Sequence, residues 1–306
     1  MLDLVIIGAG PAGLTAAIYA ARAQMNAVII ENHIAGGQIA TTGAVDNYPG
    51  MPGVQGLVMA EQFRTHAEQM GAHFQRGQVT GIENSGTVKK ILLADGEPLT
   101  TKAVIAATGA APRSLGMPGE EALRGNGVSY CAMCDGAFFY GKRVCVVGGG
   151  DTAVEDAFSL SRQASEVILI HRRDSLRAQK AHAARVLGIP NVSARWNAVV
   201  TEILSEGGRV SGVRVQDVKN HKEEILPVDG VFIAVGMAPE TGFLRPLGIV
   251  DEYGYVQAGE DCRTAVPGLF AAGDLRRKAV RQIVTAAADG ASAIRSVQAY
   301  LELLEI

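Results

Sequence analysis

Cys131 and Cys134, two cysteines three residues apart and followed directly by Asp135, are the part of this sequence with the clearest chemical potential. Thiols at this spacing can close a disulfide, and in an intracellular protein a C-x-x-C indicates a redox dithiol or half of a metal site. A structural zinc site needs four ligands, and the remaining cysteines, Cys145 and Cys262, have no partner at metal-binding spacing. The pattern favours redox chemistry over zinc, and no metal is expected.

The first of two glycine-rich motifs lies near the N-terminus, where the apolar stretch 2–7 leads into G-A-G-P-A-G at 8–13. Between an expected strand and a helix expected at 14–22, this G-x-G-x-x-G is typical of a dinucleotide-binding βαβ unit. The glycines let a pyrophosphate approach the backbone at the helix N-terminus. A strand expected at 27–30 ends at Glu31, a suitable acceptor for a ribose 2′-hydroxyl. The alternative is a glycine-rich turn in another kind of α/β protein.

The same arrangement recurs in mid-chain, where a strand expected at 144–147 leads into G-G-G-D-T-A at 148–153. Alignment of the two copies gives these pairs: Gly8 with Gly148, Gly10 with Gly150, Gly13 with Ala153, and Glu31 with His171. In place of the carboxylate, the second copy has H-R-R at 171–173 and then Arg177. Guanidinium groups suit a 2′-phosphate, so the first site is expected to bind FAD or NAD and the second NADP. A solvated helix start is the alternative explanation of the arginines.

We expect an α/β protein of two Rossmann-like, three-layer domains, the second inserted in the first. The first domain would be discontinuous, comprising residues 1–112 and 243–306, and the second would comprise 115–240. The first domain is further expected to contain a helix at 57–70, strands at 73–82, 88–93 and 102–107, and a C-terminal strand followed by a helix at about 281–304. The second is expected to contain two hairpins formed by 197–205, 209–217 and 223–228, and a strand at 230–235.

The composition excludes several kinds of partner. The net charge is −3 and there is no basic block, so neither nucleic acid nor an anionic membrane is expected. No run reaches the roughly 18 apolar residues that span a bilayer, and the N-terminus lacks the features of a signal peptide. A cytoplasmic protein without a membrane partner is therefore expected.

Taken together, the motifs resemble those of the low-molecular-weight bacterial thioredoxin reductases over essentially the whole chain. They are G-A-G-P-A-G at 8–13, G-G-Q at 36–38, D-N-Y-P-G at 46–50, A-T-G at 107–109, C-A-M-C-D-G at 131–136, G-G-G-D-T-A at 148–153, H-R-R-D-S-L-R at 171–177, G-D at 273–274 and R-Q at 281–282. Met133 and Ala137 depart from the common pattern without affecting the expected chemistry.

The resemblance implies two cofactors, FAD in the first domain and NADPH in the second. The residues implied for FAD are Gly8, Gly10, Pro11, Ala12, Gly13, Glu31, Gly37, Gln38, Asn47, Thr108, Gly109, Gly273, Asp274, Arg281, Gln282 and Ile283. Those implied for NADPH are Gly148, Gly150, Asp151, Thr152, Ala153, His171, Arg172, Arg173 and Arg177.

The resemblance also implies a catalytic relay from NADPH through FAD and the Cys131–Cys134 disulfide to thioredoxin or a thioredoxin-like protein. Cys134 would face the flavin, Cys131 would attack the partner, and Asp135 would protonate the departing thiolate. A carboxylate that only caps a helix is the alternative for Asp135. The family is homodimeric and rotates one domain against the other, with suitable hinges expected at 110–118 and 236–245.

Two other functions remain open at this stage. One is a reductase of the same fold that takes electrons from another donor, such as ferredoxin, although the arginine cluster argues against it. The other is a flavin-binding redox sensor, whose dithiol would signal to a partner without turnover.

Overall fold

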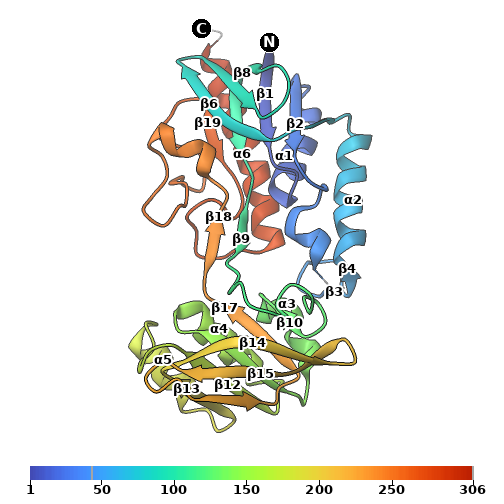
Figure 1. Cartoon of the computed structure of the whole chain (residues 1–306). Coiled ribbons are helices and arrows are strands. Elements are labelled where there is room, and N and C mark those ends of the chain that lie inside the picture. Colours follow the sequence, from blue (N-terminus) through green and yellow to red (C-terminus); the bar gives the residue numbers. More distant parts are fainter. Residues whose placement is uncertain (43, 305–306) are drawn as a thin grey trace. The chain divides into compact units, whose positions relative to one another are not determined.

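The computed structural model describes residues 1–42 and 44–304, and its contacts divide the chain into two compact units (Figure 1). Unit 1 consists of residues 1–111 together with 238–306, and unit 2 consists of residues 112–237. Each unit contains parallel strands and helices, so the predicted α/β class is confirmed.

The central sheet of unit 1 has seven strands. Its spatial order is β5 (His73–Arg76), β2 (Ala27–Glu31), β1 (Leu2–Ile7), β8 (Leu99–Ala106), β7 (Val88–Leu93) and β6 (Val79–Ser85), with β19 (Leu269–Ala271) paired to the last part of β8. β6 and β7 run antiparallel to their neighbours and the other strands are parallel. β1 is almost fully buried from Leu4 to Ile7, as a parallel strand covered on both faces requires.

The helices of unit 1 bring the two ends of the chain together. α1 (Pro11–Arg22) and α6 (Ile283–Leu304) lie side by side, blue and red in Figure 1. A Cβ atom at Gly290 of α6 would lie 2.3 Å from the carbonyl oxygen of Ala12 in α1. This close approach therefore requires glycine. Unit 1 also contains the helix α2 (Gly56–Gln69) and the short elements η1 (Gly37–Thr41), β3 (Ala44–Val45), β4 (Val54–Gln55) and η3 (Gly242–Leu247).

The prediction of one strand at 73–82 is wrong. Gly77 and Gln78 interrupt it, and the two halves lie at opposite edges of the sheet. β5 pairs with β2 at one edge and β6 pairs with β7 at the other. The continuous β-forming composition hides the break, because glycine and one polar residue are only a weak turn signal.

Unit 2 contains a five-stranded sheet that is parallel throughout. Its order is β10 (Val128–Ser129), β17 (Gly230–Ala234), β11 (Arg143–Gly148), β12 (Glu166–His171) and β13 (Val192–Trp196). Its helices are α3 (Ala132–Asp135), η2 (Gly136–Phe139), α4 (Asp151–Leu160) and α5 (Lys180–Leu187). The strands β14 (Ala198–Glu206), β15 (Arg209–Asp217) and β16 (Glu223–Leu226) form an antiparallel sheet, which confirms the two predicted hairpins.

The two segments that connect the units pair with each other. β9 (Ala110–Pro112) and β18 (Met237–Pro239) form a two-stranded ribbon. Gly109, just before β9, has φ of 70°, and Gly236, just before β18, has φ of 112°. Such left-handed angles favour glycine, so both crossings begin with a turn that other residues rarely adopt.

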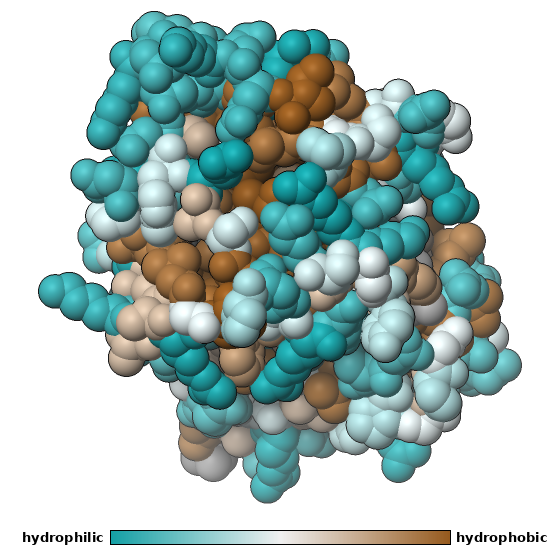
Figure 2. All heavy atoms as spheres, turned by 90° about the horizontal axis from the view of Figure 1, so that it is seen from below, coloured by the Kyte–Doolittle hydropathy of each residue, from teal (hydrophilic) through white to brown (hydrophobic). Residues whose placement is uncertain are grey.

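Seen from below, hydrophilic and hydrophobic side chains are interspersed (Figure 2). Within residues 1–42 and 44–304, no helix is both long and apolar enough to cross a membrane.

Candidate active site

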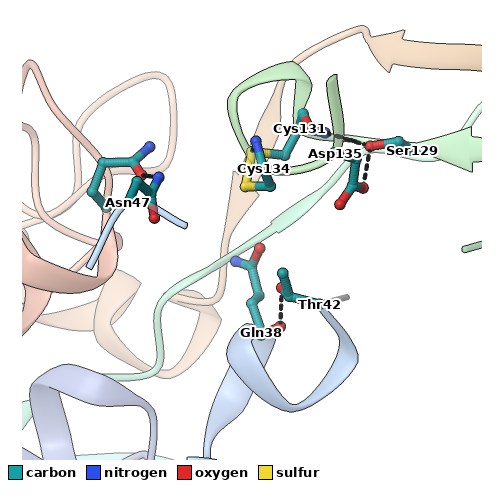
Figure 3. The surroundings of a disulfide bond; sticks show 8 residues. Gln38, Thr42, Asn47, Ser129, Cys131, Cys134 and Asp135 are labelled. Carbon is teal, nitrogen blue, oxygen red and sulfur yellow. Dashed lines mark hydrogen bonds between the residues drawn. A yellow bond between two sulfur atoms is a disulfide. The ribbon is translucent and has the colours of Figure 1, made fainter. Parts of the chain in front are cut away.

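Cys131 and Cys134 form a disulfide at the start of α3, with their Cα atoms 5.3 Å apart (Figure 3). Cys131 is the N-cap of this single helical turn, and its sulfur accepts a hydrogen bond from the backbone N–H of Cys134 at 3.2 Å. An N–H directed at this sulfur also favours its thiolate form once the disulfide is reduced. The oxidised pair fits the predicted redox-active dithiol.

Asp135 lies half-buried at the end of the same helical turn. The hydroxyl of Ser129 donates a hydrogen bond to its Oδ2 at 2.7 Å (Figure 3). Burial raises the pKa of the Asp135 carboxyl, and the hydrogen bond from Ser129 opposes that shift. An aspartate with a raised pKa next to a thiol pair is suited to general acid and base work.

The polypeptide before the dithiol is fixed by the buried carboxylate of Glu120. It accepts backbone N–H groups from residues 115, 116 and 117, and it accepts the hydroxyl of Tyr130 at 2.6 Å. Tyr130 directly precedes Cys131, so this carboxylate joins the segment that follows β9 to the dithiol segment.

The second glycine-rich loop of the chain lies in unit 2, where it follows β11 and leads into α4, as predicted. A Cβ atom at Gly148 would lie 2.4 Å from the carbonyl oxygen of Ala234, and one at Gly149 would lie 2.2 Å from the His171 ring. A Cβ at Gly150 would meet no atom within 4 Å. The first two glycines are therefore needed because other residues of unit 2 pack tightly against them. The space beside Gly150 is free of protein atoms, as the approach of a phosphate to the backbone requires.

His171 is the last residue of β12, and the three arginines follow it. The backbone N–H of Arg177 donates to the carbonyl of Gly149 at 2.7 Å, which holds the basic segment against the glycine loop. His171 is buried, and its Nε2 has no hydrogen-bond partner in the described part of the chain. Burial and then the charges of Arg177, Arg173 and Arg172 lower its pKa, so it is neutral near pH 7. The arginines are exposed and form a cationic group beside the loop.

In unit 1 the predicted FAD residues converge at the carboxyl ends of the parallel strands. Gly8 follows β1 and packs on the Ala107–Thr108 backbone that follows β8. Glu31 ends β2, and its Oε2 accepts the backbone N–H of Ala9 at 2.7 Å. Gly273 follows β19, and a Cβ there would lie 2.9 Å from the Cβ of Ala12. Ligands of open α/β sheets bind at this edge.

The remaining predicted FAD residues close around the same edge. Gly37 lies over the first loop, since its Cβ would be 3.2 Å from the Cα of Gly10. The Gln38 amide donates to the carbonyl of Ala110, and the Asn47 amide donates to Gln282 at 2.8 Å. The other members of this set are placed as follows: Pro11 and Gly13 in the first turn of α1, Thr108 donating to the Glu240 carbonyl, Gly109 directly after it, Arg281 stacked on Tyr255, and Ile283 at the start of α6.

Asp274 provides a test of whether these residues fit a cofactor. Its Oδ1 is buried and has no hydrogen-bond partner among the described residues. Burial raises the pKa of this carboxyl, while the charges of Lys278 and Arg281 act in the opposite direction. An unpaired buried oxygen is costly unless a ligand supplies a donor. The hydroxyl-rich chain of FAD supplies such donors, so the residues present fit this cofactor.

Behind Asp274 lies a buried ionic cluster formed by Arg276, Lys278 and Asp289. The Asp289 carboxylate of α6 accepts hydrogen bonds from Arg276 at 2.9 Å, Lys278 at 2.9 Å and the backbone N–H of Gly273 at 2.9 Å. Burial opposes its charge, but these hydrogen bonds outweigh burial and lower its pKa. The cluster fixes the backbone that presents Asp274.

Sequence patterns missed Ser129, Glu120 and this cluster. Ser129 lies two residues before Cys131, a spacing that no motif singles out. The Asp289 carboxylate accepts the backbone N–H of Gly273, and a loop and the start of α6 separate these two residues in the sequence. A charged residue that becomes buried has no recognisable sequence pattern. The described residues contain no group of three or more His, Cys, Asp and Glu side chains that could hold a metal ion.

Two glycine loops of the dinucleotide-binding type and a C-x-x-C disulfide in one chain define a nucleotide-dependent disulfide oxidoreductase. A family model described as pyridine nucleotide-disulphide oxidoreductase matches residues 2–290. The chain is 45% identical over 303 residues to the thioredoxin reductase of Listeria monocytogenes and 46% identical over 303 residues to that of Bacillus subtilis. These alignments cover 99% of this chain and 95% and 96% of the two relatives.

Among solved structures, the crystal structure of thioredoxin reductase from Streptococcus pyogenes matches with a TM-score of 0.93 and 45% identity, covering 99% of both chains. The chain belongs to the pyridine nucleotide-disulphide oxidoreductase family and, within it, to the thioredoxin reductases, whose cofactors are FAD and NADPH.

Proposed function

We propose that this chain is a thioredoxin-disulfide reductase, which passes electrons from NADPH through FAD and the Cys131–Cys134 pair to a thioredoxin or a thioredoxin-like protein. The observation that carries the proposal is the disulfide at the start of α3 with Asp135 beside it. The similarity to thioredoxin reductases over 99% of the chain supports the same function.

Each unit has its own part in this proposal. Unit 1 would hold FAD at the carboxyl edge of its parallel sheet, with Gly8–Gly13 at the pyrophosphate, Glu31 at the ribose and Asp274 at the hydroxyl-bearing chain. Unit 2 would hold NADPH, with Gly148–Ala153 at the pyrophosphate and the exposed arginines after β12 at the 2′-phosphate. When bound, the flavin supplies the electron-transfer chemistry that links a nicotinamide to a disulfide.

The chemistry of the protein residues then proceeds by thiol–disulfide exchange. The Cys131 thiolate attacks one sulfur of the partner disulfide, and the departing partner thiolate takes a proton from Asp135. The Cys134 thiol returns a proton to Asp135 and, as the thiolate, attacks the Cys131 sulfur. The second partner thiolate leaves and takes a proton from the solvent. The pair ends as a disulfide and the partner as a dithiol, so two electrons have moved to the partner.

A protein partner is supported by three exposed apolar side chains that lie near the dithiol in the sequence. Met133 is 62% exposed, Phe138 is 55% exposed and Tyr140 is 80% exposed, and all three lie within ten residues of Cys131. Exposed aromatic and methionine side chains are enriched at protein interfaces. They provide a surface for a folded substrate.

The proposal also includes reorientation of the two units, because one dithiol serves both a flavin and a protein. The crossings at β9 and β18, with their positive-φ glycines, would act as hinges. A homodimer and a cytoplasmic location are part of the same proposal, and sedimentation analysis and cell fractionation test them.

Purified protein should have a flavin absorption spectrum and should oxidise NADPH continuously when thioredoxin is supplied. The amount of NADPH consumed should equal the amount of thioredoxin disulfide reduced. A single turnover without continued oxidation would instead support the redox sensor. Turnover with reduced ferredoxin and not with NADPH would support the other reductase.

A further inference from the structure

Ser129 is held rigidly at the centre of the dithiol segment. It lies in β10, where its register partner is Phe232 of β17, and it is only 5% exposed. A residue fixed by a sheet has little freedom to move, so its hydroxyl is a defined point from which neighbouring groups are positioned.

The hydroxyl of Ser129 contacts the Asp135 carboxylate and the backbone of Cys131. Its oxygen lies 2.7 Å from Asp135 Oδ2, 3.1 Å from the backbone nitrogen of Cys131 and 3.4 Å from the Cys131 carbonyl oxygen. A hydroxyl has one proton to donate and two lone pairs to accept with. The proton goes to the carboxyl oxygen, which is the nearer of the two acceptors, and a lone pair accepts the Cys131 N–H.

We propose that Ser129 is a positioning residue that joins the Asp135 carboxylate to the backbone of Cys131, so that the acid and the attacking thiol keep a fixed relation. This inference rests on the proposed function, in which Asp135 protonates the leaving thiolate. Ser129 itself touches no substrate atom. It acts through the geometry and the protonation of Asp135.

Loss of this hydroxyl has a defined effect on protonation. A donor directed at a carboxylate favours the charged form, and burial disfavours it. Without Ser129 the burial acts unopposed, and the pKa of Asp135 rises further above its ordinary value. Asp135 would then hold its proton over a wider pH range.

A second carboxyl group packs against the same helical turn, and its titration has to be distinguished from that of Asp135. Asp156 of α4 accepts the backbone N–H of Ala132, and burial followed by the charge of Glu155 raises its pKa to about 7. These two aspartates, from α3 and α4, titrate close to the dithiol. The experiment therefore needs an Asp156→Asn variant beside Asp135→Asn.

The test is an NMR titration of the oxidised, FAD-loaded protein labelled with ¹³C at aspartate carboxyl groups. The Asp135 and Asp156 signals are assigned by their disappearance in Asp135→Asn and Asp156→Asn. Ser129→Ala should raise the Asp135 midpoint by roughly one pH unit, the scale of one lost hydrogen bond to a carboxylate. Ser161→Ala is the matched control, because its hydroxyl also donates within unit 2, to the carbonyl of Phe158.

Ser129→Thr and Ser129→Val give a second comparison, since these two side chains have similar shape and only threonine keeps the hydroxyl. Valine should shift the Asp135 midpoint upward relative to threonine. Equal midpoints in folded parent and Ser129→Ala proteins, or in the threonine and valine variants, would overturn the proposal. If Ser129→Ala shifts the midpoint but the parent does not reduce thioredoxin, the positioning stands and the proposed function fails.

Discussion

The two thiols of the disulfide have different surroundings although they belong to one helical turn. Cys131 is the N-cap, and its sulfur faces the N–H of Cys134. Cys134 lies inside the turn, and its backbone supplies that N–H. The thiolate of the reduced pair is therefore stabilised at Cys131, which agrees with its proposed role as the attacking thiol.

We predict that Cys131→Ser and Cys134→Ser fail differently. Both variants should lose thioredoxin reduction while NADPH still bleaches the flavin, because that step does not use the thiols. Cys134→Ser, which retains Cys131, should trap a mixed disulfide with thioredoxin. Mass spectrometry of the trapped complex locates the linked cysteine. A complex that forms only with Cys131→Ser would reverse the assignment.

Asp135→Asn should keep flavin reduction by NADPH and slow the reoxidation of the reduced enzyme by thioredoxin by roughly 10²–10⁴-fold, the range of general acid catalysis. The amide oxygen of the asparagine can still accept the hydrogen bond from Ser129. The substitution therefore removes the acidic proton of residue 135 and keeps the position of its side chain. Stopped-flow measurement of both half-reactions provides the comparison. The Asp135 side chain makes no capping hydrogen bond, so a variant that reoxidises at the parent rate would leave Asp135 with only its bond to Ser129 and no catalytic role.

At this scale, residues with a fixed local spacing were predictable and residues joined by tertiary contacts were not. The cysteines and Asp135 share one short motif. Ser129 is equally close in sequence, but its contact with Asp135 depends on β10 entering the sheet beside β17, and no spacing rule records that.

At the scale of elements, the two strand–loop–helix units have the same pattern with opposite charges at the end of the second strand. β2 ends at Glu31, whose carboxylate is held by the N–H of Ala9. β12 ends at His171, followed by the exposed arginines. The two units therefore differ in the charge that follows the second strand, as the proposed binding of a 2′-hydroxyl in unit 1 and of a 2′-phosphate in unit 2 would require.

Replacement of Arg172, Arg173 and Arg177 by glutamine should raise the KM for NADPH, leave the reaction with NADH nearly unchanged and preserve FAD content. Each hydrogen bond to a charged group contributes on the order of 1.5–3 kcal/mol, so two or three contacts favour NADPH by roughly a hundredfold or more. Comparison of kcat/KM for both nucleotides in the parent and the triple variant tests this.

The control for this prediction is Arg195→Gln, which neutralises an exposed arginine of β13 that pairs with Glu224. It should leave both nucleotide reactions unchanged. Equal use of NADH and NADPH by the parent protein would show that the arginines do not recognise the phosphate.

The sequence predicted elements with a strong local period or a glycine-rich boundary, such as β1, α1 and the hairpins of β14–β16. It missed α5 and β13, because residues 178–197 have mixed polarity and no clear period. β13 has only one buried residue, Val192, at the sheet edge, and such a strand is defined by its neighbour β12 rather than by its own composition.

At the scale of the whole molecule, the N-terminal and C-terminal parts of the chain meet in unit 1, where α1 packs against α6. The ionic cluster of Arg276, Lys278 and Asp289 includes a residue of α6, next to Gly290 at this contact. All three side chains are nearly inaccessible, with exposed fractions of 3%, 6% and 7%. A buried charge whose partner is removed becomes strongly unfavourable. The cluster therefore couples α6 to the segment after β19.

We predict that Asp289→Asn destabilises the FAD-loaded protein by about 3–5 kcal/mol, the usual cost of breaking a buried ion pair from one side. Arg276 and Lys278 would then lack their shared carboxylate. The midpoint of thermal unfolding should fall by roughly 10 °C. Glu68→Gln, which breaks the exposed Arg64–Glu68 pair of α2, should change stability by less than about 1 kcal/mol.

The pH dependence gives this prediction a second, independent test. The folded-state pKa of Asp289 is lowered, so its contribution is fully present above the unfolded value near 3.8 and is lost as the pH falls through the folded pKa. The stability difference between the parent and Asp289→Asn should be constant from pH 8 down to about pH 5 and should shrink below about pH 4. A difference that stays the same at pH 3 would mean that altered packing, and not the lost charge, destabilises the variant.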